Sequence, residues 1–545
     1  MRLNEPGANS RGIRPDDMAR VDGRVWPWLV LALLLALCLG HGLRVTAGLA
    51  LPPDPDALRD IGFAQGFLDG NWFGDPAYAN TRRYYPPLIS ALAALAIRLG
   101  GVEDIPRFWV LAGPFLGLVP VAAFFSFMWR LAGPAAAACG TAVFVLANSA
   151  TADPWVGGGY SPWILVPLLA QAGFLATATL ILSRAAKADW REAPVLGAAI
   201  GLTFLAHPVP GMLLGAMLAA TLCRAPGIGR RAMVFLALAG ATAACFASFF
   251  LLPLILSHPA GIVHRAPGAW VAGALDGQHI DHASIAVEHG PWLLALAVLV
   301  RRRWFPSGAW PLLAAWMGIC LVELGRHALC GPADSMVCRV GRVPVHHYHL
   351  YLQIAGACLA GAALPELAKW LPGPPRRRQA VLACAGTIAL TAGGMALLSR
   401  DYDWRVHALA RDHADAIVMD LGVYRWILRE TPPGAVFATF RDGGTDGAFD
   451  PANFATMAAG RRLVATHSLF SNPYTDWTSR EATRAAIAAW LTGEGPPPSS
   501  APVPWAIAPR DTPVRADRAT QVHETAKHRI FAIHPWPISR PMLGN

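Results

Sequence analysis

The sequence is poor in charged residues. Asp, Glu, Lys and Arg make up 15% of its 545 residues, whereas about 25% is usual for a soluble globular protein. Hydrophobic residues account for 54% of the chain, many of them in long uninterrupted runs. These numbers exclude an ordinary soluble enzyme. They predict a polytopic membrane protein, because a helix needs roughly 20 apolar residues to cross a bilayer.

The sequence also lacks the cysteine and serine patterns of several enzyme classes. Its nine cysteines are scattered, and none has the Cys-x-x-Cys or Cys/His spacing of a structural metal site. No Gly-x-Ser-x-Gly motif surrounds Ser468 or Ser471, so a hydrolase of that type has no support. Cys330 and Cys338 share a short polar loop, for which a disulfide and two free thiols both stay open.

The positive charge follows the membrane pattern. The net charge of +10 does not predict a nucleic-acid partner, because Lys and Arg fall in short clusters between apolar runs. The clusters lie after alternate runs, which is typical of cytoplasmic turns. We predict about eleven transmembrane helices in an all-α bundle. The expected spans are 26–50, 107–130, 134–151, 161–183, 193–206, 209–224, 231–257, 284–300, 309–329, 344–365 and 379–398.

Two apolar runs need separate treatment. Residues 88–100 are too few to span, and counting them as a span would turn every later Arg cluster outward. We therefore expect a helix on the outer surface. The run 26–50 follows basic residues and ends in small ones, so a cleaved signal peptide is an alternative. We favour an uncleaved anchor, because the run is longer than a usual signal core.

Three regions follow from this pattern. We predict a cytoplasmic N-terminal tail at 1–25, a transmembrane domain at 26–398 with an outer loop at 51–106, and an extracytoplasmic α/β domain at 399–545. In the last region long apolar runs give way to short alternating patterns separated by turn residues. Helices are expected at 412–429, 451–459 and 478–491, and strands at 435–440, 462–465, 505–508 and 529–534.

Acidic residues directly follow the first apolar run. Asp54 and Asp56 stand in the sequence Leu-Pro-Pro-Asp-Pro-Asp. Carboxylates at a membrane surface suit proton abstraction or cation binding, although capping of the next helix accounts for the same spacing. We predict that Asp54 and Asp56 are catalytic. A divalent cation, Mg or Mn, is a further option, with Asp56 and Asp153 as its ligands.

Other polar residues at the predicted outer face are candidates for substrate binding. Glu323 and Arg326 lie one helical turn apart in a span, where they serve a substrate or neutralise each other. Arginine and histidine at the head-group level suit a phosphate group, although simple snorkelling to the interface explains them as well. The remaining candidates are Arg82, Arg83, Tyr85, Asp153, His207, Arg339, Arg342 and His346.

Taken together, these motifs resemble the GT-C superfamily of membrane glycosyltransferases. The resemblance covers about residues 25–260 and implies a sugar donor carried on polyprenyl phosphate, with an acidic residue of the first outer loop as base or metal ligand. The chain departs from the family in its Asp-Pro-Asp spacing. The matching segments are Asp54-Pro55-Asp56, Gly70-Asn71-Trp72, Tyr85-Pro86-Pro87-Leu88, Arg107, Asp153-Pro154 and Ala206-His207-Pro208.

We therefore expect a multi-pass enzyme of a bacterial inner membrane that moves a sugar from a polyprenyl-phosphate donor to an extracytoplasmic glycan, lipid or protein. Two alternatives stay open. A transporter or flippase of a lipid-linked saccharide would be favoured by internal repeats, and none is visible. A non-catalytic GT-C-like protein of cell-envelope assembly would carry the same residues.

Overall fold

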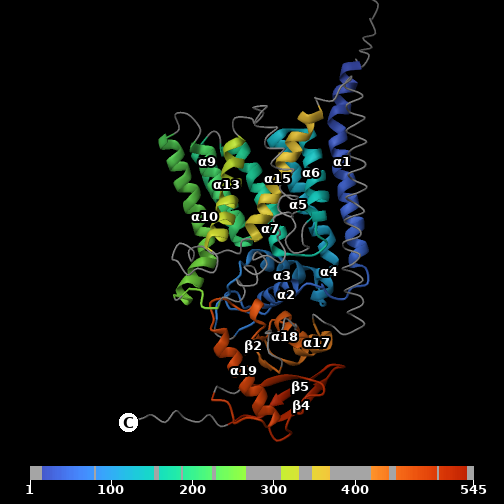
Figure 1. Cartoon of the computed structure of the whole chain (residues 1–545), viewed down its shortest axis with the longest axis vertical. Coiled ribbons are helices and arrows are strands. Elements are labelled where there is room, and N and C mark those ends of the chain that lie inside the picture. The colour runs from blue at the N-terminus through green and yellow to red at the C-terminus, as the bar shows by residue number, and fades with distance from the viewer. Residues whose placement is uncertain are drawn as a thin grey trace, which may run out of the picture.

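The computed structural model describes residues 15–78, 81–151, 159–185, 188–223, 229–259, 261–264, 309–330, 346–368, 419–440, 450–499 and 503–536. Figure 1 shows long helices gathered at one end of the molecule and a small sheet at the other end. Helices α2 (Pro55–Leu68) and α3 (Leu88–Gly100) lie between these two parts. The expected order, a helical region followed by an α/β tail, is confirmed.

The helices of the larger part agree with the apolar runs. Four helical stretches of the described residues are long and apolar enough to cross a membrane: Val25–Thr46, Ile105–Ala132, Val166–Arg184 and Gly229–Ser257. The expected number of eleven spans is not confirmed, and the runs 284–300 and 379–398 lie outside the described residues. The helices are α1 (Pro15–Thr46), α4 (Ile105–Leu116), α5 (Leu118–Ala132), α6 (Pro134–Thr151), α7 (Val166–Arg184), α8 (Ala193–Ala206), α9 (Pro208–Cys223), α10 (Gly229–Ser257), α13 (Trp310–Cys330) and α15 (His346–Ala368).

Small residues allow these helices to pack closely. A Cβ atom added at Gly361 of α15 would lie 2.5 Å from the Cα atom of Gly140 in α6. Close backbone approach of this kind is the usual packing mode of membrane helices, where apolar burial gives little driving force. Large apolar side chains instead point outward from α10, where Phe249 is 65% and Leu256 is 71% exposed. That surface suits contact with lipid.

The tail contains a five-stranded sheet with the strand order β2-β1-β3-β5-β4. The first three strands pair in parallel, whereas β5 pairs antiparallel with both β3 and β4. Side chains alternate between the two faces, as the strand period requires. Phe437, Ile507 and Ile530 join one core with α17 and α18, while Ala438, Ala506 and Phe531 join another with α19. The elements are α17 (Leu421–Glu430), β1 (Val436–Thr439), α18 (Pro451–Ala458), β2 (Arg462–Leu463), α19 (Trp477–Thr492), β3 (Trp505–Pro509), β4 (Ala519–Glu524) and β5 (His528–Ile533).

The outer loop and the tail share one hydrophobic core. Ile61 of α2, Ile97 of α3 and Phe454 of α18 belong to the same buried cluster. Contact between α2 and α18 is direct, because a Cβ atom at Gly62 would lie 2.2 Å from the carbonyl oxygen of Met457. Helix α2 is therefore packed closely against the tail.

The sheet is extended by the outer loop itself. Tyr78 forms an isolated parallel bridge with Leu463 at the β2 edge, and the Leu463 N–H donates to the Ala77 carbonyl at 2.7 Å. The Tyr78 hydroxyl lies 2.7 Å from Thr466 Oγ1 and 2.9 Å from Ser471 Oγ. This segment after α2 thereby covers a strand edge that would otherwise be unpaired.

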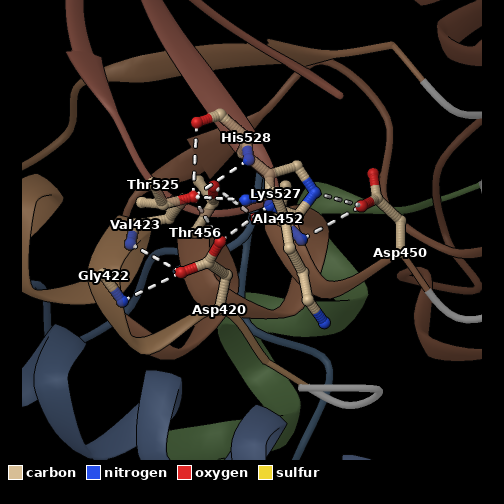
Figure 2. Close-up of polar contacts among 9 residues, drawn as sticks. All are labelled: Asp420, Gly422, Val423, Asp450, Ala452, Thr456, Thr525, Lys527 and His528. Carbon is tan, nitrogen blue, oxygen red and sulfur yellow. Dashed lines mark hydrogen bonds and ion pairs between the residues drawn. The ribbon is translucent and has the colours of Figure 1, made fainter. Parts of the chain in front are cut away.

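Figure 2 shows a buried polar cluster that ties the tail together. The Nδ1 atom of His528, at the start of β5, lies 2.8 Å from Asp420 Oδ2, and its Nε2 atom lies 3.9 Å from Asp450 Oδ1. Asp420 is the N-cap of α17 and Asp450 is the N-cap of α18. Thr525 also donates to Asp420 at 2.8 Å. One imidazole thus connects two helix starts with the sheet.

Candidate functional site

Asp54 is the N-cap of α2. Its Oδ1 atom accepts the backbone N–H of Asp56 at 2.7 Å, which satisfies the helix start. The side chain is 2% exposed, and its Oδ2 atom has no hydrogen-bond partner among the described residues. Burial, together with the nearby charge of Asp56, raises the pKa of Asp54 well above its usual value. Capping alone does not account for this arrangement, because buried carboxylate oxygens are normally hydrogen-bonded.

Arg59 joins the other two acids of α2. Its Nη1 atom donates to Asp56 Oδ1 at 2.7 Å, and its Nε and Nη2 atoms donate to Asp60 Oδ1 at 3.2 and 3.0 Å. Burial raises the pKa of Asp60 to about 6, and the charge of Arg59 opposes that rise. Asp60 is therefore ionised at neutral pH and has the proton affinity of a general base.

An aromatic cluster lies beside the acidic residues. The Phe63 ring of α2 packs against Tyr85 and Tyr84, with ring centroids 5.8 and 6.0 Å apart. The Arg59 guanidinium lies 4.3 Å from the Tyr85 centroid, and that of Arg83 lies 5.0 Å from the Phe63 centroid. Both cations are thus stacked on rings of one cluster. Four sequence candidates meet here: Asp54, Asp56, Arg83 and Tyr85.

Arg83 is a buried cation, with 4% of its surface exposed. Its Nη2 atom donates to the Asn71 carbonyl at 3.3 Å, while Nε and Nη1 have no hydrogen-bond partner among the described residues. Burial lowers the pKa of Arg83 to about 10, and the carboxylate of Asp75 opposes that change. A buried guanidinium with two unpartnered nitrogens is costly, so an anionic ligand would stabilise it.

A segment of the tail contacts residues beside the site. We call residues 466–474 the tail loop. Its Phe470 carbonyl accepts from the Tyr84 hydroxyl at 3.4 Å, and its Ser468 carbonyl lies 3.0 Å from His264 Nε2. The tail loop therefore contacts both the outer loop and the segment after α10.

His207 lies at a helix break beside this region. It ends α8 in an extended conformation, is buried, and its ring centroid lies 4.3 Å from that of His347 in α15. Leu205, two residues earlier, packs in one apolar cluster with Tyr84. The break between α8 and α9 thus borders the outer-loop residues.

The remaining sequence candidates lie elsewhere or outside the described residues. Glu323 and Arg326 pair with each other in α13, where the Nε–Oε2 distance is 2.9 Å. Arg82 uses its backbone carbonyl to accept from Asn472 at 3.0 Å, and its side chain is exposed. His346 begins α15, but its side chain is not described. Asp153, Arg339, Arg342 and Cys338 lie outside the described residues.

Among the described residues, no three His, Cys, Asp or Glu side chains are grouped as metal ligands. Asp56, one of the two expected ligands, has its Oδ1 atom bonded to Arg59, and Asp153, the other, lies outside the described residues. We therefore derive no chemical step through a metal.

Two residues of this region, Asp60 and Asn472, were not predicted from the sequence. Asp60 lies four residues after Asp56, and this spacing on one helix face could have revealed it. Asn472 donates to Asp75 across 397 residues of sequence, at 2.8 Å. No local pattern indicates such a contact.

Comparison with protein-family models and with curated proteins gave no match. Solved structures do match by fold. The crystal structure of ArnT from Cupriavidus metallidurans bound to undecaprenyl phosphate aligns with a TM-score of 0.54 at 15% identity, over 93% of this chain and 98% of that one. The archaeal oligosaccharyltransferase AglB from Archaeoglobus fulgidus, in complex with an inhibitory peptide and a dolichol-phosphate, aligns with a TM-score of 0.52 at 10% identity, over 89% of this chain and 69% of that one. The chain therefore shares the fold of these two proteins, in agreement with the resemblance noted in its sequence.

Proposed function

We propose that this protein is a membrane glycosyltransferase, which moves a sugar from a polyprenyl phosphate to an acceptor outside the cytoplasm. The observation that carries the proposal is the pairing of buried carboxylates with buried arginines on one outer loop. Among the described residues, Asp54 keeps an unpartnered carboxylate oxygen, and Arg83 keeps two unpartnered nitrogens. Two proteins with this fold have been solved with a polyprenyl lipid bound, ArnT with undecaprenyl phosphate and AglB with a dolichol-phosphate.

The carboxylates suit the acceptor side of the reaction. A carboxylate takes the proton of the acceptor hydroxyl while the acceptor oxygen forms its bond to the anomeric carbon of the sugar. Asp60 has the proton affinity for this step, because its pKa is raised to about 6 by burial. Asp54, whose pKa is raised by burial and by the charge of Asp56, offers its Oδ2 atom, which has no partner among the described residues, to a hydroxyl group of the sugar or the acceptor.

The arginines suit the donor side. As the bond between the anomeric carbon and the phosphate oxygen breaks, its electron pair leaves with the polyprenyl phosphate. A guanidinium stabilises that developing charge. Arg83 has donors for this role that no other described residue uses, whereas Arg59 is bonded to Asp56 and Asp60 and opposes the rise in the pKa of Asp60. Tyr85 stacks on Phe63 and contacts the Arg59 guanidinium, so it borders the same site.

A lipid-linked donor also fits the neighbouring surface. Tyr84 packs in an apolar cluster with Phe250 and Leu254 of α10 and with Tyr474 of the tail loop. The outward face of α10 continues as large exposed apolar side chains, such as Ile255 at 61%. A polyprenyl chain lying along α10 would bring its phosphate toward the outer loop.

The proposal also includes the orientation of the chain in the membrane and the remaining substrate-binding candidates. Residues 1–25 lie in the cytoplasm, residues 26–398 form the membrane domain, and the tail, 399–545, lies outside the cytoplasm of a bacterial inner membrane. His207, next to the outer loop, serves substrate binding. The further candidates for this role are Arg82, Asp153, Glu323, Arg326, Arg339, Arg342 and His346.

The experiment measures transfer from labelled polyprenyl-phosphate sugars by the full chain in purified membranes. Asp54→Asn keeps the helix cap, because Asn and Asp cap equally well, and should lower the rate about 100-fold, because the oxygen offered to the substrate no longer belongs to a carboxyl group. Asp104→Asn is the matched control, since Asp104 caps α4 in the same way and is exposed. Full activity of both Asp54→Asn and Asp56→Asn would refute the assignment. Movement of the labelled lipid across the membrane without any sugar transfer would identify a transporter or flippase instead.

A further inference from the structure

The tail loop reaches the proposed donor site through a buried asparagine. Asn472 is 1% exposed, and its Nδ2 atom donates to Asp75 Oδ2 at 2.8 Å and to the Arg82 carbonyl at 3.0 Å. Its Oδ1 atom accepts the backbone N–H of Tyr474 at 3.0 Å. Both polar atoms of the amide therefore have partners that only one orientation of the amide satisfies.

Asp75 is the partner that links this asparagine to Arg83. The Asp75 side chain is 1% exposed, and its Oδ1 atom accepts the Ala77 N–H at 2.8 Å. Burial raises the pKa of Asp75, while the bonds from Ala77 and Asn472 and the charge of Arg83 oppose the rise. The hydrogen bond from Asn472 thus favours the charged form of a carboxyl group whose pKa burial raises.

Asp75 and Arg83 flank the antiparallel bridge between Gly74 and Arg82. The Asp75 N–H donates to the Thr81 carbonyl and the Arg83 N–H donates to the Phe73 carbonyl, each at 3.0 Å. This pairing makes Asp75 a nearby counter-charge of Arg83. Among the described residues, Arg83 has one hydrogen bond, to the Asn71 carbonyl, and its guanidinium lies 4.0 Å from the centroid of the Phe67 ring. Neither contact carries a negative charge. If Asp75 rotated or became protonated, the buried guanidinium would lose its counter-charge and shift toward solvent.

We propose that Asn472 of the tail is a positioning residue for donor binding, which acts through Asp75 to hold Arg83 where it meets the phosphate of a polyprenyl lipid. The inference rests on the proposed function of Arg83. It makes the tail part of the donor site, although Asn472 itself touches no substrate.

The test measures binding of undecaprenyl phosphate, without a sugar, to the purified full chain in nanodiscs. Asn472→Leu keeps the side-chain volume but removes the amide, and should weaken binding about tenfold, the worth of one buried hydrogen bond to a charged group. Ser471→Ala is the matched control. It removes a contact between the tail loop and Tyr78 without touching Asp75, and should leave binding unchanged.

A double-mutant cycle separates the inference from the proposed function. If Asn472 acts through Arg83, Asn472→Leu should have no further effect on binding in an Arg83→Gln background. Independent, additive effects would overturn the inference while leaving Arg83 as a phosphate ligand. Unchanged binding in Arg83→Gln alone would refute the proposed role of Arg83 and the inference with it. Should Asn472→Leu fail to fold, Asp75→Asn keeps the shape of the site and should give the same tenfold loss.

Discussion

At the scale of single residues, Arg59 distinguishes the acidic residues of α2 by the hydrogen bonds that it donates. It donates hydrogen bonds to one oxygen of Asp56 and one of Asp60, whereas Asp54 receives none from it. Burial then raises the pKa of Asp54 well above that of an exposed carboxyl, whereas Arg59 holds the pKa of Asp60 at about 6. Different proton affinities on neighbouring carboxyls are how active sites assign acid and base roles.

The rate of transfer should therefore depend on pH through Asp60. A base is active when ionised, so kcat/KM should be constant above pH 7 and fall about tenfold per unit below pH 6. Arg59→Gln removes the charge that lowers the pKa of Asp60, so this decline should move to higher pH. Arg98→Gln, on the exposed end of α3, is the control and should leave the profile unchanged. An Arg59→Gln profile that overlays the wild type would contradict the role of Asp60 as base.

At the scale of elements, the acidic helix depends on the tail for its position. Gly62 allows α2 to lie against the backbone of α18, and Arg461 of the tail bonds to Asp69, just after α2, at 2.6 Å. Both Arg461 and Asp69 are largely buried in this contact. Because the acidic residues of the site lie on α2 or at its start, a shift of α2 moves them together.

Gly62→Ala should therefore destabilise the protein and lower transfer. The new Cβ atom would lie 2.2 Å from the Met457 carbonyl oxygen, so α2 or α18 must move, at a cost of about 1–3 kcal/mol. Gly66→Ala is matched in helix and chemistry, but its Cβ atom would lie at an ordinary 3.4 Å from Pro76 Cβ. Its free energy of unfolding should be unchanged or raised by about 1 kcal/mol, because Ala has a higher helix propensity than Gly. The unfolding temperatures and transfer rates of the two variants test this prediction.

The His528 cluster should make the tail sensitive to acid. Burial alone would raise the pKa of Asp420, but the hydrogen bonds from His528, Val423 and Thr525 outweigh it, and the net shift is downward. A lowered pKa in the folded state contributes stability above the unfolded-state pKa of about 3.9, and that stability is lost as pH falls through the folded value. Asp420→Asn should remove this dependence and lower the unfolding temperature at pH 7.

The control for Asp420→Asn is Asp476→Asn, which changes an exposed N-cap of α19 in the same way. Because Asn caps a helix as well as Asp, any difference between the two variants reports the buried His528 contact. Equal unfolding temperatures for the two variants at pH 7 would show that the contact adds nothing to stability.

At the scale of the whole molecule, apolar runs predicted the helices well and the site only in part. The run 193–206 coincides with α8, because a helix of apolar residues between a charged turn and a His-Pro break has few alternatives. Strand β4 was missed, because among Ala519–Glu524 only Ala519 is buried and no alternation shows. Asp54 was found because it follows a span directly, whereas Asn472 meets Asp75 only through tertiary packing.

Orientation is a property of the whole chain and has its own test. Ser499 is exposed near the end of the loop after α19, so Ser499→Cys should react in intact cells with a thiol reagent that does not cross membranes. Cys223, exposed at the end of α9 in a predicted cytoplasmic turn, is an internal control that should react only after lysis. If the Ser499→Cys variant gained its extra label only after lysis, the outward orientation of the tail would be wrong.

The bridge between Tyr78 and the tail has a consequence for the timing of biosynthesis. Tyr78 and its partner Thr466 are 388 positions apart in the chain. At 5–20 residues per second, the ribosome needs about 20–80 s to cover that distance. Throughout that time the outer loop has been synthesised, but β2 and Asn472, which contact it, have not. A nascent chain therefore cannot complete the outer-loop site before its last domain has been synthesised, and any activity of that site begins only after the tail has folded.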